Sequence, residues 1–101
     1  MKTATLALLA LCACGAGTEI NTGSYDLRCA TDVDCTPVYQ GDACAVCGCP
    51  NAAVNTSQVT RYEADLARLR TKCGPMPAIA CGACLPRRGL CTSSRCSSRP
   101  E

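Results

Sequence analysis

The chain has 101 residues, of which 12 are cysteine and none is histidine, and its formal net charge is +2 at pH 7. Without histidine it cannot form a Ser-His or Cys-His nucleophile or a mixed Cys/His metal site. Three tyrosines are the only aromatic residues, too little apolar bulk for the core of a short chain without cross-links. The cysteine content therefore predicts a single disulfide-rich domain in an exported protein.

The N-terminal residues have the pattern of an export signal. An apolar run over residues 4–11 follows Lys2; it is too short to span a bilayer and is typical of a signal peptide. The run ends in Leu11-Cys12-Ala13-Cys14, which resembles the lipobox of small cysteine-rich bacterial lipoproteins. The resemblance is general, and rests on this motif and on the cysteine spacing. It implies a signal peptide over residues 1–13, cleaved after Ala13, and acylation of Cys14.

Cysteine parity favours this cleavage site over the frame that would cut before Cys12. Cleavage before Cys14 leaves ten cysteines from Cys29 onward, an even set that can pair completely, whereas the other frame adds an odd thiol. Ordinary secretion with a cut near residue 16 or 17 also leaves ten. A secreted protein is therefore the alternative to a lipid-anchored one.

The segment after Cys14 is expected to be a flexible tether over residues 14–28, because it is rich in Gly, Ser and Thr. Acyl chains on Cys14 would make the membrane lipid a partner, since two lipid signals give stable anchoring. By the sorting rule of well-studied bacteria, Gly15 directly after the acylated residue favours the outer membrane. We therefore expect an exported protein, lipid-anchored in the bacterial envelope.

Charge is divided unevenly along the chain. Residues 14–55 hold five acidic residues and one arginine, a net charge of −4, and residues 56–101 hold eight basic and three acidic residues, a net charge of +5. Either half could face a protein partner of opposite sign, although solvated surface explains the pattern equally well. Nucleic acid is not expected as a partner, because no aromatic residues alternate with the basic ones.

The expected domain spans residues 29–96, followed by a frayed tail over residues 97–101. Ten cysteines would form five disulfides, each worth roughly 2–4 kcal/mol, and spacing alone leaves several hundred pairings open. The paired residues would be Cys29, Cys35, Cys44, Cys47, Cys49, Cys73, Cys81, Cys84, Cys91 and Cys96.

We expect one α-helix, from about residue 61 to residue 72. Thr60 and Glu63 form a capping-box pattern before it, and Gly74 and Pro75 follow its end. One face carries an apolar stripe that should lie on the cysteine-rich core, made of Val59, Tyr62, Leu66, Leu69 and Cys73.

The rest of the domain should consist of short strands, hairpins and long loops. A short strand is expected over residues 36–40, a compact turn over 44–49 and an extended segment over 76–80. Residues 85–90 should form a loop between Cys84 and Cys91, and residues 91–96 a hairpin with its turn at 92–95.

The cysteines also allow two chemical alternatives. Cys44, Cys47, Cys81 and Cys84 have the spacing of a four-thiolate zinc site, and Cys81-Gly82-Ala83-Cys84 resembles a redox-active dithiol. Both are weaker than the disulfide interpretation in an exported chain. Asp32 and Asp34 could bind calcium, although turns capped by their carboxylates explain the pattern more simply.

No catalytic or cofactor-binding motif is present, so we expect a binding or structural module without an enzymatic activity or cofactor. The alternative is a serine protease inhibitor. In such proteins a rigid disulfide-bounded loop presents an exposed arginine, and Arg87-Arg88 in the loop between Cys84 and Cys91 has that pattern.

Overall fold

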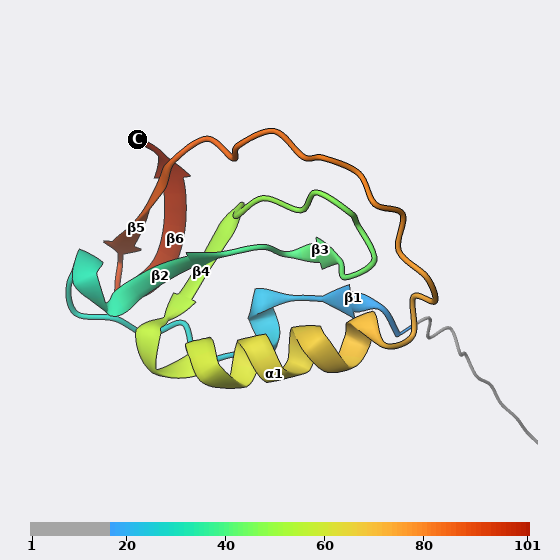
Figure 1. Ribbon diagram of the computed structural model, residues 1–101. Coiled ribbons are helices and arrows are strands. Elements are labelled where there is room, and N and C mark those ends of the chain that lie inside the picture. The colour runs from blue at the N-terminus through green and yellow to red at the C-terminus, as the bar shows by residue number, and fades with distance from the viewer. Residues whose placement is uncertain (1–16) are drawn as a thin grey trace, which may run out of the picture.

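The computed structural model describes residues 17–101, so the predicted cleavage and acylation sites at Ala13 and Cys14 lie outside the described residues. Within them the chain forms a small disulfide-rich domain with one α-helix, three antiparallel strand pairs and five disulfides, as the sequence predicts (Figure 1). In chain order the elements are β1 (Glu19–Ile20), β2 (Cys35–Val38), β3 (Gly41–Asp42), β4 (Ala52–Asn55), α1 (Val59–Arg70), β5 (Arg87–Thr92) and β6 (Arg95–Pro100).

The strands pair as β1 with β3, β2 with β4, and β5 with β6. In the longest pair, β5–β6, Cys91 lies opposite Cys96 and the turn falls at Ser93–Ser94, within the predicted hairpin turn. This hairpin lies against β2 and β4 at the end of the molecule away from β1 (Figure 1). Short strand pairs of this kind need cross-links to form a stable domain.

The apolar stripe of the helix is confirmed. Tyr62 is buried, and three neighbours on the same face are partly buried around it: Val59, Leu66 and Leu69. The stripe lies mainly on aliphatic and tyrosine side chains rather than on cystines. This face attaches α1 to the rest of the domain.

The predicted start of the helix is wrong by two residues. A 3-10 turn over Thr56–Gln58 leads directly into α1, and the side chain of Asn55 accepts a hydrogen bond of 2.9 Å from the backbone N–H of Ser57. Thr60 therefore lies inside the helix and the Thr60/Glu63 capping box does not form. A cap one turn earlier replaces it, because Asn is a strong cap residue.

The helix also ends two residues before the prediction. The N–H groups of Lys72 and Cys73 donate to the carbonyls of Leu69 and Arg70, at 3.0 and 3.1 Å, in a tightened final turn. Gly74 follows with φ of +71°, the left-handed conformation expected of a glycine after a helix.

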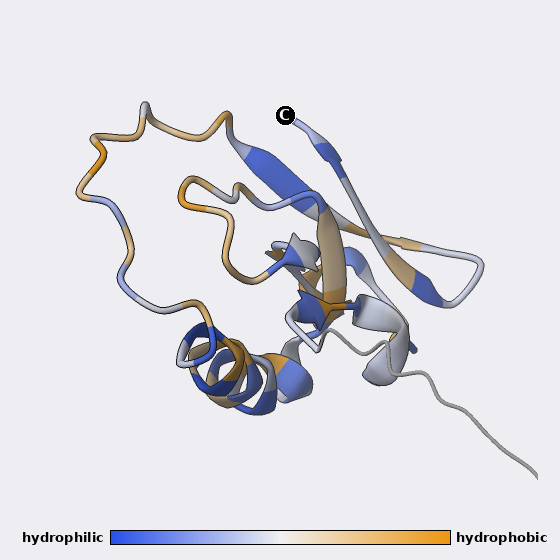
Figure 2. Ribbon diagram, turned by 90° about the vertical axis from the view of Figure 1, so that its right-hand side faces the viewer, coloured by the Kyte–Doolittle hydropathy of each residue, from blue (hydrophilic) through white to orange (hydrophobic). Residues whose placement is uncertain are grey.

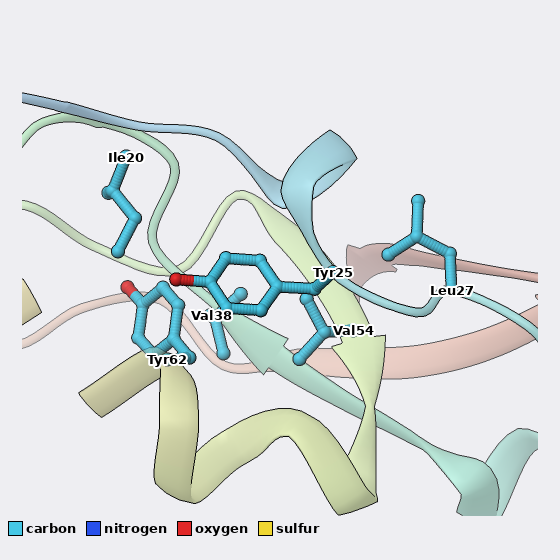
Figure 3. Close-up of a cluster of buried hydrophobic side chains, with 6 residues drawn as sticks. All are labelled: Ile20, Tyr25, Leu27, Val38, Val54 and Tyr62. Atoms are coloured by element: carbon cyan, nitrogen blue, oxygen red, sulfur yellow. The ribbon is translucent and has the colours of Figure 1, made fainter. Parts of the chain in front are cut away.

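The main core contains the segment that we expected to be a tether. Six buried side chains form this core, shown in Figure 3: Ile20, Tyr25, Leu27, Val38, Val54 and Tyr62. Half of them belong to residues 17–28, so the tether prediction is wrong for that segment. The free energy gained by burying these side chains against β2, β4 and α1 exceeds the conformational entropy lost when the Gly and Ser residues between them are ordered.

The C-terminal tail and the loop at 85–90 also differ from the prediction. β6 continues to Pro100, and the N–H of Glu101 donates a hydrogen bond of 3.2 Å to the carbonyl of Pro86, so residues 97–101 are not frayed. The expected loop is strand from Arg87 onward. Beneath the hairpin lies a second core cluster of Cys35, Ala53 and Cys96.

Candidate functional site

The five disulfides form two groups. Two of them join the hairpin to residues 29–35, with Cα atoms 5.8 and 5.4 Å apart: Cys29–Cys91 and Cys35–Cys96. The other three join the turn at residues 44–49 to the chain after the helix, and their order is the same on both sides: Cys44–Cys73, Cys47–Cys81 and Cys49–Cys84. All ten cysteines are in disulfides, as predicted. Their connectivity could not be predicted from the sequence spacing.

This connectivity removes both chemical alternatives. The four cysteines of the proposed zinc site all lie in disulfides, so they offer no thiolates. Cys81 and Cys84 are bonded to different partners rather than to each other, which is not the arrangement of a redox dithiol. The sulfurs of Cys29, Cys35 and Cys96 lie within 4.8 Å of one another, but these residues too are in disulfides.

The two carboxylates considered as calcium ligands, Asp32 and Asp34, accept hydrogen bonds from backbone N–H groups. Asp34 accepts hydrogen bonds from the N–H groups of Ala30 and Thr31, at 2.7 and 3.0 Å, and these bonds lower the pKa of its carboxyl. Asp32 accepts a hydrogen bond of 2.8 Å from the N–H of Cys91. Both groups stabilise the local turn and its contact with the hairpin, which agrees with the simpler interpretation.

The turn at residues 44–49 and the segment at residues 73–86 together form what we call the cross-linked surface. Every residue from 74 to 86 is exposed, and the segment contains neither helix nor strand. Its exposed apolar side chains are Met76 at 41%, Ile79 at 57% and Leu85 at 81%, and Val46 in the turn is 38% exposed. Figure 2 shows both parts as mostly hydrophobic ribbon. Because three disulfides hold this surface, its shape is fixed without a core beneath it.

A groove lies along the hairpin turn, with a volume of about 400 Å³; we call it the hairpin groove. It is lined by Gly23, Tyr25, Asp26, Leu27, Arg28, Ser93, Ser94 and Arg95. The turn residues Ser93 and Ser94 have φ of +52° and +62°, the left-handed conformation of a type I′ hairpin turn, which usually selects glycine or asparagine.

Charge in the groove is mainly basic. Arg28 donates two hydrogen bonds of 3.0 Å from its side chain to the carboxylate of Asp26, and these lower the pKa of Asp26 to about 2. Arg95 is exposed and pairs with Arg28 through an antiparallel backbone bridge. With Asp26 ionised at neutral pH, the groove has one positive charge in excess. The sequence signal for it was weak: only the predicted turn at 92–95 pointed to this region.

The two arginines proposed as an inhibitory loop lie in β5. Arg87 is half-buried, and its guanidinium donates to the side-chain and backbone oxygens of Ser98, at 3.1 and 3.2 Å. Arg88 is exposed but lies opposite Arg99 in the strand pair. The prediction of a free loop at this position is wrong.

Among residues 17–101, no helix has the length and apolar character needed to cross a bilayer. Comparison with known proteins shows no matching family model, no similar curated protein and no similar solved structure.

Proposed function

We propose that the protein is a non-enzymatic, lipid-anchored module of the bacterial cell envelope that binds a partner through a surface of fixed shape. One observation supports this most directly: two disulfides, Cys29–Cys91 and Cys35–Cys96, fix the hairpin whose turn lines the groove described above. A surface fixed before binding loses little conformational entropy when a partner binds. The lipobox-like motif ending at Cys14 supports the anchor, and the disulfides fit an oxidising compartment.

The partner site that we assign within this proposal is the hairpin groove. Its excess positive charge favours an acidic group on the partner. The left-handed backbone at Ser93 and Ser94 also supports a binding role, because strained turns are more frequent at functional sites. A protein partner with an exposed carboxylate fits this chemistry best.

The anchor and the cross-links are tested by the intact mass of the protein from the native membrane fraction, alkylated with and without prior reduction. The expected result is a mass that includes acyl chains on Cys14 and no alkylation until the protein is reduced. A mass without acyl chains would make the protein a secreted one and refute the anchor. Alkylation before reduction would contradict the five disulfides.

The binding role is tested by photocrosslinking in living cells. A photoreactive residue in place of Ser94 should yield one crosslinked species, and the same residue in place of the exposed Ser57 should not. Adding Arg95→Glu should abolish the crosslink at position 94, because it reverses the charge of the groove. A crosslink that persists in this variant would exclude the groove as the recognition site.

The inhibitor alternative depended on a loop at Arg87-Arg88, and these residues lie in strand β5. Inhibitors of this class need an exposed arginine that fits the protease pocket, and Arg87 is instead bonded to Ser98. No contact among the described residues favours this second function over the binding module.

A further inference from the structure

The chain enters the fold beside the cross-linked surface. The carbonyl of Thr18 accepts a hydrogen bond of 2.7 Å from the N–H of Ala43. The next residue, Cys44, is bonded to Cys73, and their Cα atoms are 5.5 Å apart. Thr18 therefore lies close to both parts of the cross-linked surface, the turn and the segment after the helix.

An anchor at Cys14 would hold this end of the domain close to the lipid. Cys14 precedes Gly17 by three residues, and three residues span at most about 11 Å even when fully extended. Since residues 18–28 belong to the fold, no further length is free to lift the domain away. The face around Thr18 must then lie at the level of the lipid headgroups or just above it.

Exposed apolar side chains lie on that same face. Val46 is in the turn, and its carbonyl lies 3.6 Å from the sulfur of Cys81, two residues after Ile79. Met76 follows closely after Cys73. Figure 1 places this turn, the end of α1 and the start of the following segment on the side where the chain enters, and Figure 2 views that side directly. Exposed apolar side chains beside an anchor gain free energy by entering the interface of a bilayer.

Charge on this face is balanced. Glu19 and Asp42 lie opposite each other in the β1–β3 pair. Two basic residues lie nearby: Arg70, whose Nε donates a hydrogen bond of 3.3 Å to the carbonyl of Ala43, and Lys72 in the turn before Cys73. Two charges of each sign give no preference for anionic lipid, so apolar contact should be sufficient on a neutral bilayer.

We propose that this face is a membrane-docking face, with Val46, Met76 and Ile79 inserted at the lipid interface beside the anchor. The inference rests on the proposed acylation of Cys14. It defines the orientation of the whole domain: the β5–β6 hairpin, at the opposite end of the molecule, and the groove along its turn are directed away from the bilayer (Figure 1).

The chain has no tryptophan, so single-tryptophan variants report on one position each. Ile79→Trp places the probe on the docking face. Val33→Trp is the matched control, because Val33 is also an exposed apolar residue, at 84%, but lies in a 3-10 turn that packs against β5.

The acylated full-chain variants are reconstituted into phosphatidylcholine vesicles with or without bromine on the acyl chains. The Ile79→Trp variant should lose about half of its fluorescence or more in the brominated vesicles, because its indole would lie at the lipid interface. The Val33→Trp variant should lose none.

Intact mass accompanies each measurement, so that two failures can be told apart. If the Ile79→Trp variant is acylated but is quenched no more than the Val33→Trp variant, the docking face is overturned and the proposed anchor is not. Equal strong quenching in both variants overturns the orientation. A mass without acyl chains overturns the proposed anchor, and the docking inference with it.

Discussion

The hydroxyl of Tyr25 donates a hydrogen bond of 2.6 Å to Oδ2 of Asp65, across 40 residues of sequence. Tyr25 is buried, and its ring lies edge-on to that of Tyr62, with centroids 5.9 Å apart. Burial, followed by the bond to Asp65, raises the pKa of Tyr25 to about 12. The same bond, together with one from Arg68, lowers the pKa of Asp65. The contact fixes the N-terminal segment to the middle of α1.

This contact predicts an acid-dependent loss of stability. Because the pKa of Asp65 is lower in the folded state than in the unfolded state, its ionised form stabilises the fold at neutral pH. That contribution is lost as the pH falls below the unfolded value of about 4 and through the folded pKa. Asp65→Asn should therefore be less stable than wild type at pH 7, and the difference should shrink at pH 2. Guanidinium unfolding with the disulfides intact measures it, and a difference that is independent of pH would refute the role of the charge.

Gly89 is predicted to be intolerant of any side chain. A Cβ atom at this position in β5 would overlap the backbone carbonyl of Cys35, which cannot move away as a side-chain end could. Gly89→Ala should lower the free energy of unfolding by about 1–3 kcal/mol. Gly82→Ala is the matched control, because a Cβ there would have no neighbour within 4 Å, and its effect should stay within about 0.5 kcal/mol. Equal effects in thermal unfolding would contradict the close packing of β5 on β2.

The two groups of disulfides should contribute differently to stability. The bridges Cys35–Cys96 and Cys47–Cys81 close 61 and 34 residues, a difference worth only about 0.5 kcal/mol in chain entropy. Cys35 and Cys96 are buried, whereas Cys47 and Cys81 are exposed. Replacing the first pair by alanine should lower global stability by about 2–5 kcal/mol, as for native disulfides of small domains. Replacing the second pair should lower the unfolding midpoint by less, because its cysteines are exposed and no core side chains pack on them; guanidinium unfolding of the two variants compares them.

The strand position of Arg87 predicts resistance to trypsin. A protease needs an extended chain free of its own pairing, and Arg87 is paired in β5 and bonded to Ser98. The oxidised protein should neither inhibit trypsin at equimolar concentration nor be cut after Arg87 until it is reduced. Mass analysis of the digest and a chromogenic trypsin assay test both points. Inhibition that Arg87→Ala abolishes would restore the inhibitor hypothesis.

Local patterns predicted the elements that depend on local chemistry. The helix followed from its apolar stripe, and the hairpin from two cysteines around a short polar turn. The start of the helix was missed because two cap signals compete, and the earlier one at Asn55 is used. The hydrogen bond from the N–H of Ser57 to the side chain of Asn55 forms at the earlier signal. Residue types alone do not predict which of the two caps forms.

The tether prediction failed because burial depends on distant residues. Ile20, Tyr25 and Leu27 are too few to establish a helical or a strand period, and polar residues and a glycine separate them. Their burial requires partners in β2, β4 and α1 that the local sequence does not show. The disulfide pattern and the groove depend on the same long-range contacts. Composition predicted that the cysteines pair, but only the fold determines their partners.

The shared order of the three bridges at residues 44–49 has a consequence for how the protein must mature. In the exported protein that we propose, translocation from the N-terminus would bring these three cysteines into the oxidising compartment before Cys73, Cys81 and Cys84. Short loops close fastest, so the first bonds should form among neighbours and be non-native. Only thiol–disulfide exchange can convert them into the native set. A host compartment that supplies a disulfide isomerase as well as an oxidant should therefore raise the yield of protein with the native disulfides.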